Sequence, residues 1–416
     1  MNTQINPIPI TVRDFPSSLK SPSYLIEFGY YFTLIYAYFG EALGLAFPML
    51  GAGLLGGLAV ISLLHFGTYS MGAFRPLRFA LGCALSFLLI QGFIFQESLS
   101  DTQMRGFVTW IFALIVIHSL SLRKGFLVRF ALVAFIIGCG TLPFLKVYVA
   151  TDEMVRIGGD SGVALQNPNY FGMWCGFCAI FFIVTGLEAK NYLVRISAWV
   201  TGAFCLYLMA LTVSRASLLG VAIATVIALQ KVLKRSFLPI LGFLIFGWIL
   251  FVSGIFDDLI GYYLHRGTEE TGRSKLWSWA FTGFLDSWWT GVGLSNAKII
   301  NYRTGDRYGP HNSLLFFGFS SGIVPLGFYL AYLGQVMRCA LRASTQRESD
   351  SPYKLPLASF AIISAMVSDI TFMSPWHIVV FSVAINTEKI GNNSRKPLKN
   401  LSIGNRSKRE IEKTHL

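Results

Sequence analysis

Apolar runs of about 17 or more residues recur along this chain, and they limit its fold more than any other feature. A run of that length crosses the roughly 30 Å hydrocarbon core of a bilayer as a helix. The 416 residues are 54% hydrophobic and 13% charged, whereas about a quarter of the residues in a soluble protein are charged. A transmembrane β-barrel would instead contain short segments of alternating polarity. The sequence therefore predicts an all-α polytopic membrane protein.

Hydropathy predicts about twelve transmembrane helices. The predicted spans lie near residues 24–40, 43–64, 77–96, 107–121, 126–147, 169–187, 193–213, 216–233, 237–254, 313–336, 355–372 and 374–388. A cytoplasmic N-terminal segment (1–23) and a basic cytoplasmic tail (389–416) flank the transmembrane domain (24–388). One large extracytoplasmic loop, residues 255–312, separates the ninth span from the tenth.

The distribution of basic residues sets the predicted orientation. With both termini in the cytoplasm, 24 of the 34 Lys and Arg residues fall on the cytoplasmic side, eight of them in the tail. Cytoplasmic loops of membrane proteins carry this bias. An eleven-span arrangement would put either the long loop or the tail on the wrong side. The net charge of +13 is therefore a signal of topology and of attraction to anionic lipids, and no nucleic-acid partner is expected.

Residues 255–312 form the longest polar segment between two apolar runs. Loops of this length are usually functional or disordered, and aromatic residues such as Trp277 and Trp288 argue against disorder. The stretch Gly272–Leu285 predicts an amphipathic helix that begins with Arg273 and lies at the outer interface of the membrane. We interpret the loop as the cap of an active site and the rest of the chain as its scaffold.

Three side chains are candidate catalytic residues: Arg215, Arg273 and His311. Arg215 lies between two apolar spans, where a guanidinium requires a partner or a water-filled cavity; alternatively, it extends to the lipid headgroups. Arg273 is either a substrate ligand or a solvated interfacial charge. His311 directly precedes a span. It is either a general base, since histidine exchanges protons near neutral pH, or a polar residue at a helix start.

Four further residues are candidates for substrate binding. Asn167 and Asn169 lie at the outer start of the sixth span, where they either cap the helix or line a polar pocket. Asn312 follows His311. Asp369, near the outer end of the eleventh span, is a candidate ion-pair partner for an outer arginine.

No metal site and no cofactor are expected from the sequence. Asp257 and Asp258 have no third ligand nearby, and no cluster of residues has metal-ligand spacing. Cys175 and Cys178 have the spacing of a redox motif, but they lie inside an apolar run without a second pair. We interpret the six cysteines as packing residues.

Two arginines and a histidine at the outer face fit one kind of chemistry. Arginine binds the oxygens of a diphosphate bidentately and stabilises the charge that develops as it leaves. Histidine can activate an acceptor hydroxyl. Together they indicate transfer of a group from a lipid-diphosphate carrier to an alcohol on the external face of a membrane.

The order of four motifs resembles the O-antigen ligase and O-antigen polymerase superfamily. The motifs are Thr-Val-Ser-Arg-Ala-Ser-Leu-Leu-Gly from Thr212, Gly-Arg-Ser-Lys-Leu-Trp from Gly272, Gly-Val-Gly-Leu-Ser-Asn from Gly291, and His-Asn-Ser-Leu-Leu from His311, which a Gly-Ile-Val-Pro-Leu-Gly helix follows. The likeness covers roughly residues 167–333. It implies about twelve spans, a large periplasmic loop, and metal-independent, inverting glycosyl transfer from an undecaprenyl-diphosphate-linked glycan.

The resemblance also implies roles for individual residues. By motif position, Arg215 and Arg273 would bind the diphosphate, and His311 would act as the base or orient the acceptor. Asp369 stands where ligases often carry an aspartate. Family members often place an acidic residue a turn or two after the His-Asn pair, whereas this chain has phenylalanines at 316, 317 and 319.

The favoured function is that of an O-antigen ligase in the bacterial inner membrane, with its active site facing the periplasm. Its expected partners are the undecaprenyl-diphosphate-linked glycan as donor, lipid A-core as acceptor, and membrane lipids. The nearest alternative is an O-antigen or capsule polymerase, which would use a second lipid-linked glycan as acceptor. The alternative from a different class is a transporter or flippase, for which internal repeats and charges at the membrane midplane would be expected.

Overall fold

The structure is a computed structural model that describes residues 22–45, 49–67, 71–98, 102–151, 154–159, 163–233, 261, 273–300, 307–345, 350–368 and 371–386. The chain divides into two units, Met1–Asn386 and Thr387–Leu416, and the second lies outside the described residues. The predicted ninth span (237–254), nearly all of the loop before Arg273, and Asp369 also lie outside them.

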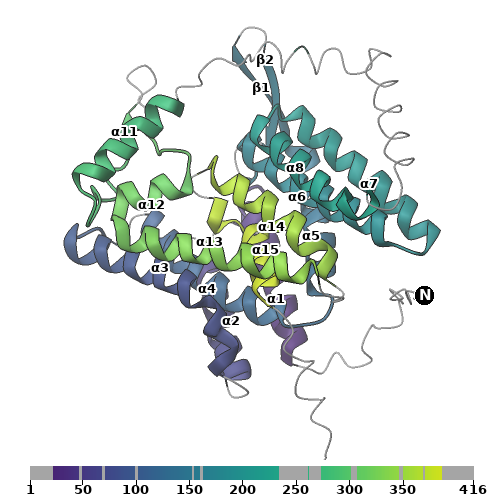
Figure 1. The fold of residues 1–416 in the computed structure, drawn as a ribbon, viewed down its shortest axis with the longest axis horizontal. Coiled ribbons are helices and arrows are strands. Elements are labelled where there is room, and N and C mark those ends of the chain that lie inside the picture. The colour runs from purple at the N-terminus through teal and green to yellow at the C-terminus, as the bar shows by residue number, and fades with distance from the viewer. Residues whose placement is uncertain are drawn as a thin grey trace, which may run out of the picture. The chain divides into compact units, whose positions relative to one another are not determined.

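Helices make up most of the described structure (Figure 1). The α-helices are α1 (Pro22–Phe39), α2 (Leu50–Gly67), α3 (Arg78–Leu89), α4 (Thr102–Ser121), α5 (Phe126–Thr141), α6 (Pro168–Glu188), α7 (Tyr192–Leu211), α8 (Arg215–Leu233), α11 (Arg273–Asp286), α12 (Ser313–Ser321), α13 (Ile323–Ala343), α14 (Ser351–Ala365) and α15 (Pro375–Ile385). Short helical turns are η2 (Met71–Leu77), η3 (Ile90–Ile94), η4 (Leu142–Phe144) and η5 (Thr371–Met373). The strands are β1 (Leu145–Thr151), β2 (Met154–Gly159), β3 (Ile299–Ile300) and β4 (Arg307–Tyr308), paired antiparallel as β1–β2 and β3–β4.

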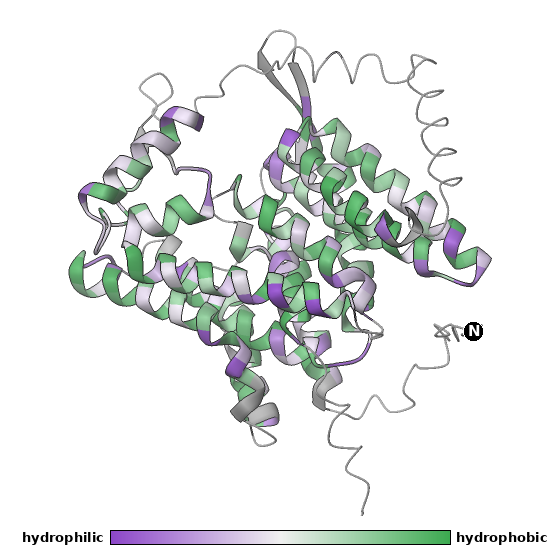
Figure 2. Cartoon of the chain, in the orientation of Figure 1, coloured by the Kyte–Doolittle hydropathy of each residue, from purple (hydrophilic) through white to green (hydrophobic). Residues whose placement is uncertain are grey.

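Among the described residues, six helical segments are long and apolar enough to cross a membrane. They are Phe74–Ile94, Met104–Ser121, Phe126–Phe144, Pro168–Glu188, Tyr192–Leu211 and Ile323–Ala343. Figure 2 shows apolar residues along most of α6, α7, α8 and α13, as expected of helices that meet other helices or lipid on every side. The predicted class of helical membrane protein is confirmed. The count of twelve spans stays a prediction.

Two of the predicted spans differ in detail from the helices of the structure. The span predicted near 126–147 is helical from Phe126 to Phe144, as α5 followed by η4, and the chain then continues into the β1–β2 hairpin. The span predicted at 313–336 is two helices, because Gly322 has a φ of 78° and ends α12 after nine residues. A Cβ atom at Gly322 would lie 2.2 Å from the carbonyl oxygen of Trp289. Only glycine fits this break.

The core is centred on α6, most of whose residues are buried. Glycines on α6 let its neighbours approach closely: a Cβ atom at Gly176 would lie 2.7 Å from the ring of Phe360 on α14. One cluster of buried phenylalanine rings joins α3, α4, α12 and η5. It consists of Phe87, Phe107, Phe316, Phe317 and Phe372. Through Phe316 and Phe317, this cluster packs α12 against α3, α4 and η5.

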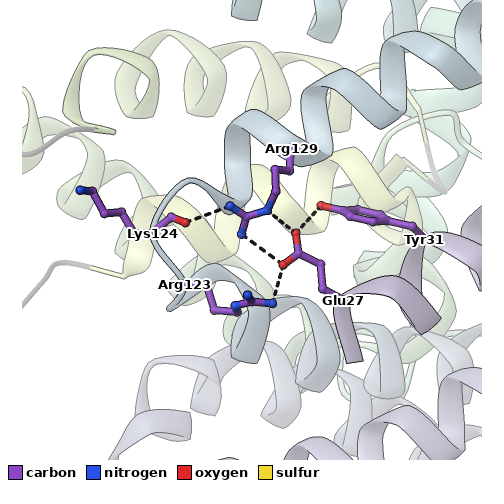
Figure 3. Close-up of polar contacts among 5 residues, drawn as sticks. All are labelled: Glu27, Tyr31, Arg123, Lys124 and Arg129. Carbon is purple, nitrogen blue, oxygen red and sulfur yellow. Dashed lines mark hydrogen bonds and ion pairs between the residues drawn. The ribbon is translucent and has the colours of Figure 1, made fainter. Parts of the chain in front are cut away.

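A buried carboxylate ties α1 to the turn between α4 and α5 (Figure 3). Glu27 accepts hydrogen bonds from Arg123 at 2.5 Å, from Arg129 at 2.6 Å and from the hydroxyl of Tyr31 at 2.9 Å. The guanidinium of Arg123 also lies over the ring of Tyr24, 3.9 Å from its centroid. Two cations around one buried anion form a network in which removal of the anion leaves like charges together.

We therefore expect Glu27→Ala to lower the free energy of unfolding by about 3 kcal/mol, the usual effect of removing one partner from a buried ion pair. The measurement is unfolding of the purified protein in detergent micelles. Glu41→Ala is the matched control, because Glu41 is an exposed carboxylate in the turn after α1. Equal stability of the two variants would contradict the role given to Glu27.

Candidate active site

The candidate base His311 lies directly before α12, in a strained backbone conformation. Its φ is 50°, in the left-handed region that side chains other than glycine rarely adopt. Its neighbour Asn312 is the N-cap of α12: the Asn312 side chain accepts hydrogen bonds from the backbone N–H groups of Leu314 at 2.9 Å and Leu315 at 3.2 Å. The cap fixes the start of the helix and with it the place of His311. Backbone strain of this kind occurs most often at functional sites.

The helix predicted in the long loop is confirmed as α11, which begins at Arg273. The indole of Trp277, one turn further on, donates a hydrogen bond of 2.9 Å to the carbonyl oxygen of Pro310. Pro310 is the residue before His311. The structure therefore brings the first turn of α11, which carries Arg273, beside the segment that carries His311, although 38 positions separate the two in the sequence.

The chain after α11 is fixed to the other end of α12. The N–H of Val292 donates to the carbonyl of Phe319 at 2.8 Å, and the N–H of Ile323 donates to the carbonyl of Trp288 at 2.8 Å. Gly291, with a φ of 71°, lies so close to this helix end that a Cβ atom there would be 2.4 Å from the N atom of Ser321. The loop is thus held at both ends of α12.

Arg215 is the first residue of α8 and is partly buried. The turn before it is packed tightly against α6: a Cβ atom at Gly172 would lie 2.6 Å from the hydroxyl of Thr212. The hydroxyl groups of Ser214 and Ser217 are 2.9 Å apart and buried. The backbone position of Arg215 is therefore set by packing on both sides of the turn.

A further arginine, Arg156 on β2, joins this turn to the start of α6. Its Nε donates to the carbonyl of Thr212 at 3.0 Å, and its Nη2 donates to the side-chain oxygen of Asn169 at 2.8 Å. Asn167 caps α6, because its side chain accepts from the N–H of Asn169 at 2.8 Å. The capping role that the sequence left open for Asn167 is confirmed. Sequence reasoning did not single out Arg156. Its one signal was that it is among the ten Lys and Arg residues that the predicted topology places outside the cytoplasm.

Contacts between helices place all of these segments at one end of the bundle. The hydroxyl of Ser313 donates to the carbonyl of Ser368 at 2.7 Å, which joins the start of α12 to the chain just after α14. The last turns of α14 pack on the first turns of α8, since a Cβ atom at Gly220 would lie 3.6 Å from Ile363. The starts of α6, α8 and α12 and the end of α14 therefore lie together. Arg215, Asn169 and His311 lie in or directly before these segments, and Arg156 on β2 is bonded to two of them.

The phenylalanines that follow the His-Asn pair are packing residues. Phe316 and Phe317 are buried in the cluster of phenylalanine rings that joins α12 to α3, α4 and η5. Phe319 packs edge-on against Trp279 of α11, with 4.4 Å between ring centroids. Within the described part of the chain, no three His, Cys, Asp or Glu residues are grouped so that they could hold a metal ion.

Comparison with known proteins gives two findings. Residues 200–330 match a family model described as O-antigen ligase. The matched segment includes Arg215, Arg273, His311 and Asn312. The chain is also similar to the teichuronic acid biosynthesis protein TuaE of Bacillus subtilis (strain 168), with 29% identity over 223 residues, which cover 49% of this chain and 45% of the relative. The chain thus spans less than half the length of that relative.

Proposed function

We propose that this protein, a member of the O-antigen ligase and polymerase superfamily through its residues 200–330, transfers a glycan from undecaprenyl diphosphate to an acceptor hydroxyl at the periplasmic face of the inner membrane. The favoured acceptor is lipid A-core, which makes the protein an O-antigen ligase. The observation that carries the proposal is the bond between Trp277 and Pro310, because it puts the arginine-bearing end of α11 beside His311.

In the proposed reaction the acceptor hydroxyl oxygen attacks the anomeric carbon of the donor sugar. The new glycosidic bond forms as the bond from that carbon to the diphosphate oxygen breaks, on the opposite face, so the configuration inverts. His311 accepts the hydroxyl proton. Arg215 and Arg273 bind the diphosphate and stabilise the negative charge that it gains on leaving.

The remaining candidates have supporting roles in this proposal. Arg156 orients Asn169 and holds the carbonyl of Thr212, so the turn before Arg215 keeps its place when substrate binds. Asn312 keeps His311 at the helix start. Asn167, Asn169 and Asp369 stay candidates for contact with the glycan or acceptor, and Asp369 lies outside the described residues.

A polymerase is the second candidate, and the name of the relative favours it. That protein is named for the biosynthesis of teichuronic acid, not for attachment of a finished polymer. The donor chemistry and the roles of Arg215, Arg273 and His311 are the same in both reactions. The two functions differ in the acceptor: lipid A-core for the ligase, and a second lipid-linked glycan for the polymerase.

The test is reconstitution of the purified protein in vesicles with a labelled undecaprenyl-diphosphate glycan. Vesicles that also contain lipid A-core are expected to yield labelled lipid A-core. Growth of the label into longer lipid-linked chains, with lipid A-core unlabelled, would identify the polymerase. Movement of the labelled lipid between leaflets without any new glycosidic bond would overturn both and favour a flippase.

Chelation gives a separate prediction. Since the proposal assigns charge stabilisation to Arg215 and Arg273, we expect the initial rate of transfer to be unchanged when EDTA is added to the vesicles. A rate that falls with EDTA and is restored by Mg²⁺ would contradict a metal-independent reaction. The control is a metal-dependent glycosyltransferase treated in the same way.

A further inference from the structure

Gln91 is a fully buried polar side chain at the end of an apolar helix face. It lies in η3, a π-helical turn that continues α3, one turn beyond the buried Phe87. Its side-chain nitrogen donates to the carbonyl of Ser320 at 2.8 Å and to the hydroxyl of Ser321 at 2.8 Å. Its side-chain oxygen accepts from the N–H of Leu294 at 2.8 Å. One amide group thus joins three parts of the chain.

The segment after η3 holds the same turn at a second point. The carboxylate of Glu97 accepts hydrogen bonds from the N–H of Ser295, at 3.0 Å, and from the hydroxyl of Ser295. Two consecutive N–H groups, those of Leu294 and Ser295, are therefore bound by side chains from residues 91–97. Both N–H groups belong to the Gly291–Ala297 turn of the long loop.

This turn is continuous with α11, so its position determines where α11 lies. Only four residues, Ser287–Thr290, separate the end of α11 from the turn. At its other end α11 is fixed by the bond between Trp277 and Pro310. If the turn is released, α11 can pivot about the remaining contact between Trp277 and Pro310. A shift of the turn would therefore move Arg273 relative to His311.

Gln91 is the second residue of η3, the π-helical turn that ends α3. Such turns are rare. A buried amide with three good hydrogen bonds also has few alternative positions, because each broken bond leaves a buried polar group unsatisfied. Gln91 can therefore hold the loop in a single register on α12.

We propose that Gln91 is a positioning residue for glycan transfer: by binding Leu294, Ser320 and Ser321 it fixes the loop turn on α12 and so sets Arg273 beside His311. This inference rests on the proposed function. Glu97, which binds Ser295 of the same turn, makes a smaller contribution to the position of the turn.

Gln91→Met is the variant that tests the role. It keeps the length and volume of the side chain and removes its three hydrogen bonds. We expect the rate of transfer at saturating donor to fall about tenfold, less than the roughly 100-fold that a misplacement of one ångström can cost. In an Arg273→Ala background the same substitution is expected to lower the residual rate by less than about twofold, because residues that act through one another are not additive.

Gln335→Met is the matched control. Gln335 lies on α13 and donates to the carbonyl of Pro76 in η2 at 3.1 Å, so it is a glutamine that joins two other helical elements without bonding the loop turn. We expect transfer by this variant to be unchanged. Glu97→Ala is the second test variant, since Glu97 is less buried than Gln91 and its substitution is expected to disturb folding less. Its rate is expected to fall about fivefold, which corresponds to about 1 kcal/mol, a usual net contribution of hydrogen bonds near the surface.

The position of α11 is measured independently of activity. Spin labels at Thr282 on α11 and Val324 on α13, both exposed, report the distance between the loop and the bundle once the six native cysteines are replaced. We expect the distance distribution to broaden in Gln91→Met and to stay narrow in Gln335→Met. An unchanged distribution in both Gln91→Met and Glu97→Ala would overturn the inference, as would additive losses of rate in the double variants. If the wild-type protein forms no glycosidic bond, the proposed function fails. The distance measurement still tests whether Gln91 fixes the position of the loop turn.

Discussion

Replacing His311 with alanine is expected to abolish glycan transfer and to leave binding of the lipid-diphosphate donor largely intact. A general base contributes about 10²- to 10⁴-fold to a rate, so the initial rate in vesicles should fall on the order of 10³-fold. Donor binding should persist, because the two arginines assigned to the diphosphate are unchanged. The measurement pairs initial rates with binding of labelled donor to the same preparation.

The backbone at His311 gives this prediction a control for folding. A histidine with a φ of 50° is strained, at a cost of the order of 1 kcal/mol that glycine avoids. His311→Gly should therefore be at least as stable as the wild type, yet transfer as poorly as His311→Ala. His65→Ala, in the last turn of α2, is the matched histidine control and should transfer normally. Equal loss of donor binding and transfer in His311→Ala would contradict a catalytic role.

The sequence predicts those parts of the fold that depend on local pattern. The loop helix was expected from Gly272 and begins at Arg273, because apolar residues at helical spacing and a polar start are local signals. The helix cap at Asn167 is also predicted from a local signal. The break at Gly322 was missed because the apolar run continues through it, although Gly322 followed by Pro325 is a local signal for the end of a helix; the conformation of the glycine itself depends on Trp289 packing from the loop.

The sequence alone does not predict the long-range contacts of the site. Gln91 and Leu294 are 203 positions apart, and Arg156 and Thr212 are 56 apart. Nothing near Gln91 in the sequence marks it as different from any polar residue at a helix end. The β1–β2 hairpin was missed for a different reason: its first strand, Leu-Lys-Val-Tyr-Val-Ala-Thr, follows an apolar helix directly and contains several apolar residues of its own, so hydropathy alone extends the span.

Arg215→Lys is expected to lower the rate of transfer about 100-fold, the effect of removing one preorganised hydrogen-bond donor from a developing anion. Lysine keeps the positive charge, but an ammonium group cannot reproduce the planar fork that binds two phosphate oxygens at once. The loss should be larger in the rate at saturating donor than in donor binding, because the charge on the diphosphate grows as it leaves.

The position of Arg215 makes this substitution informative. The turn before it is fixed by Gly172 on one side and by the bond from Arg156 to Thr212 on the other, so lysine at 215 starts α8 from the same place. Arg195→Lys is the matched control: Arg195 lies near the start of α7, is exposed, and donates to the carbonyl of Ala189 at 2.7 Å and 3.0 Å. That variant should transfer at the wild-type rate. If Arg215→Lys retains a rate within about threefold of wild type, bidentate binding of the diphosphate by Arg215 is wrong, because a point charge then suffices.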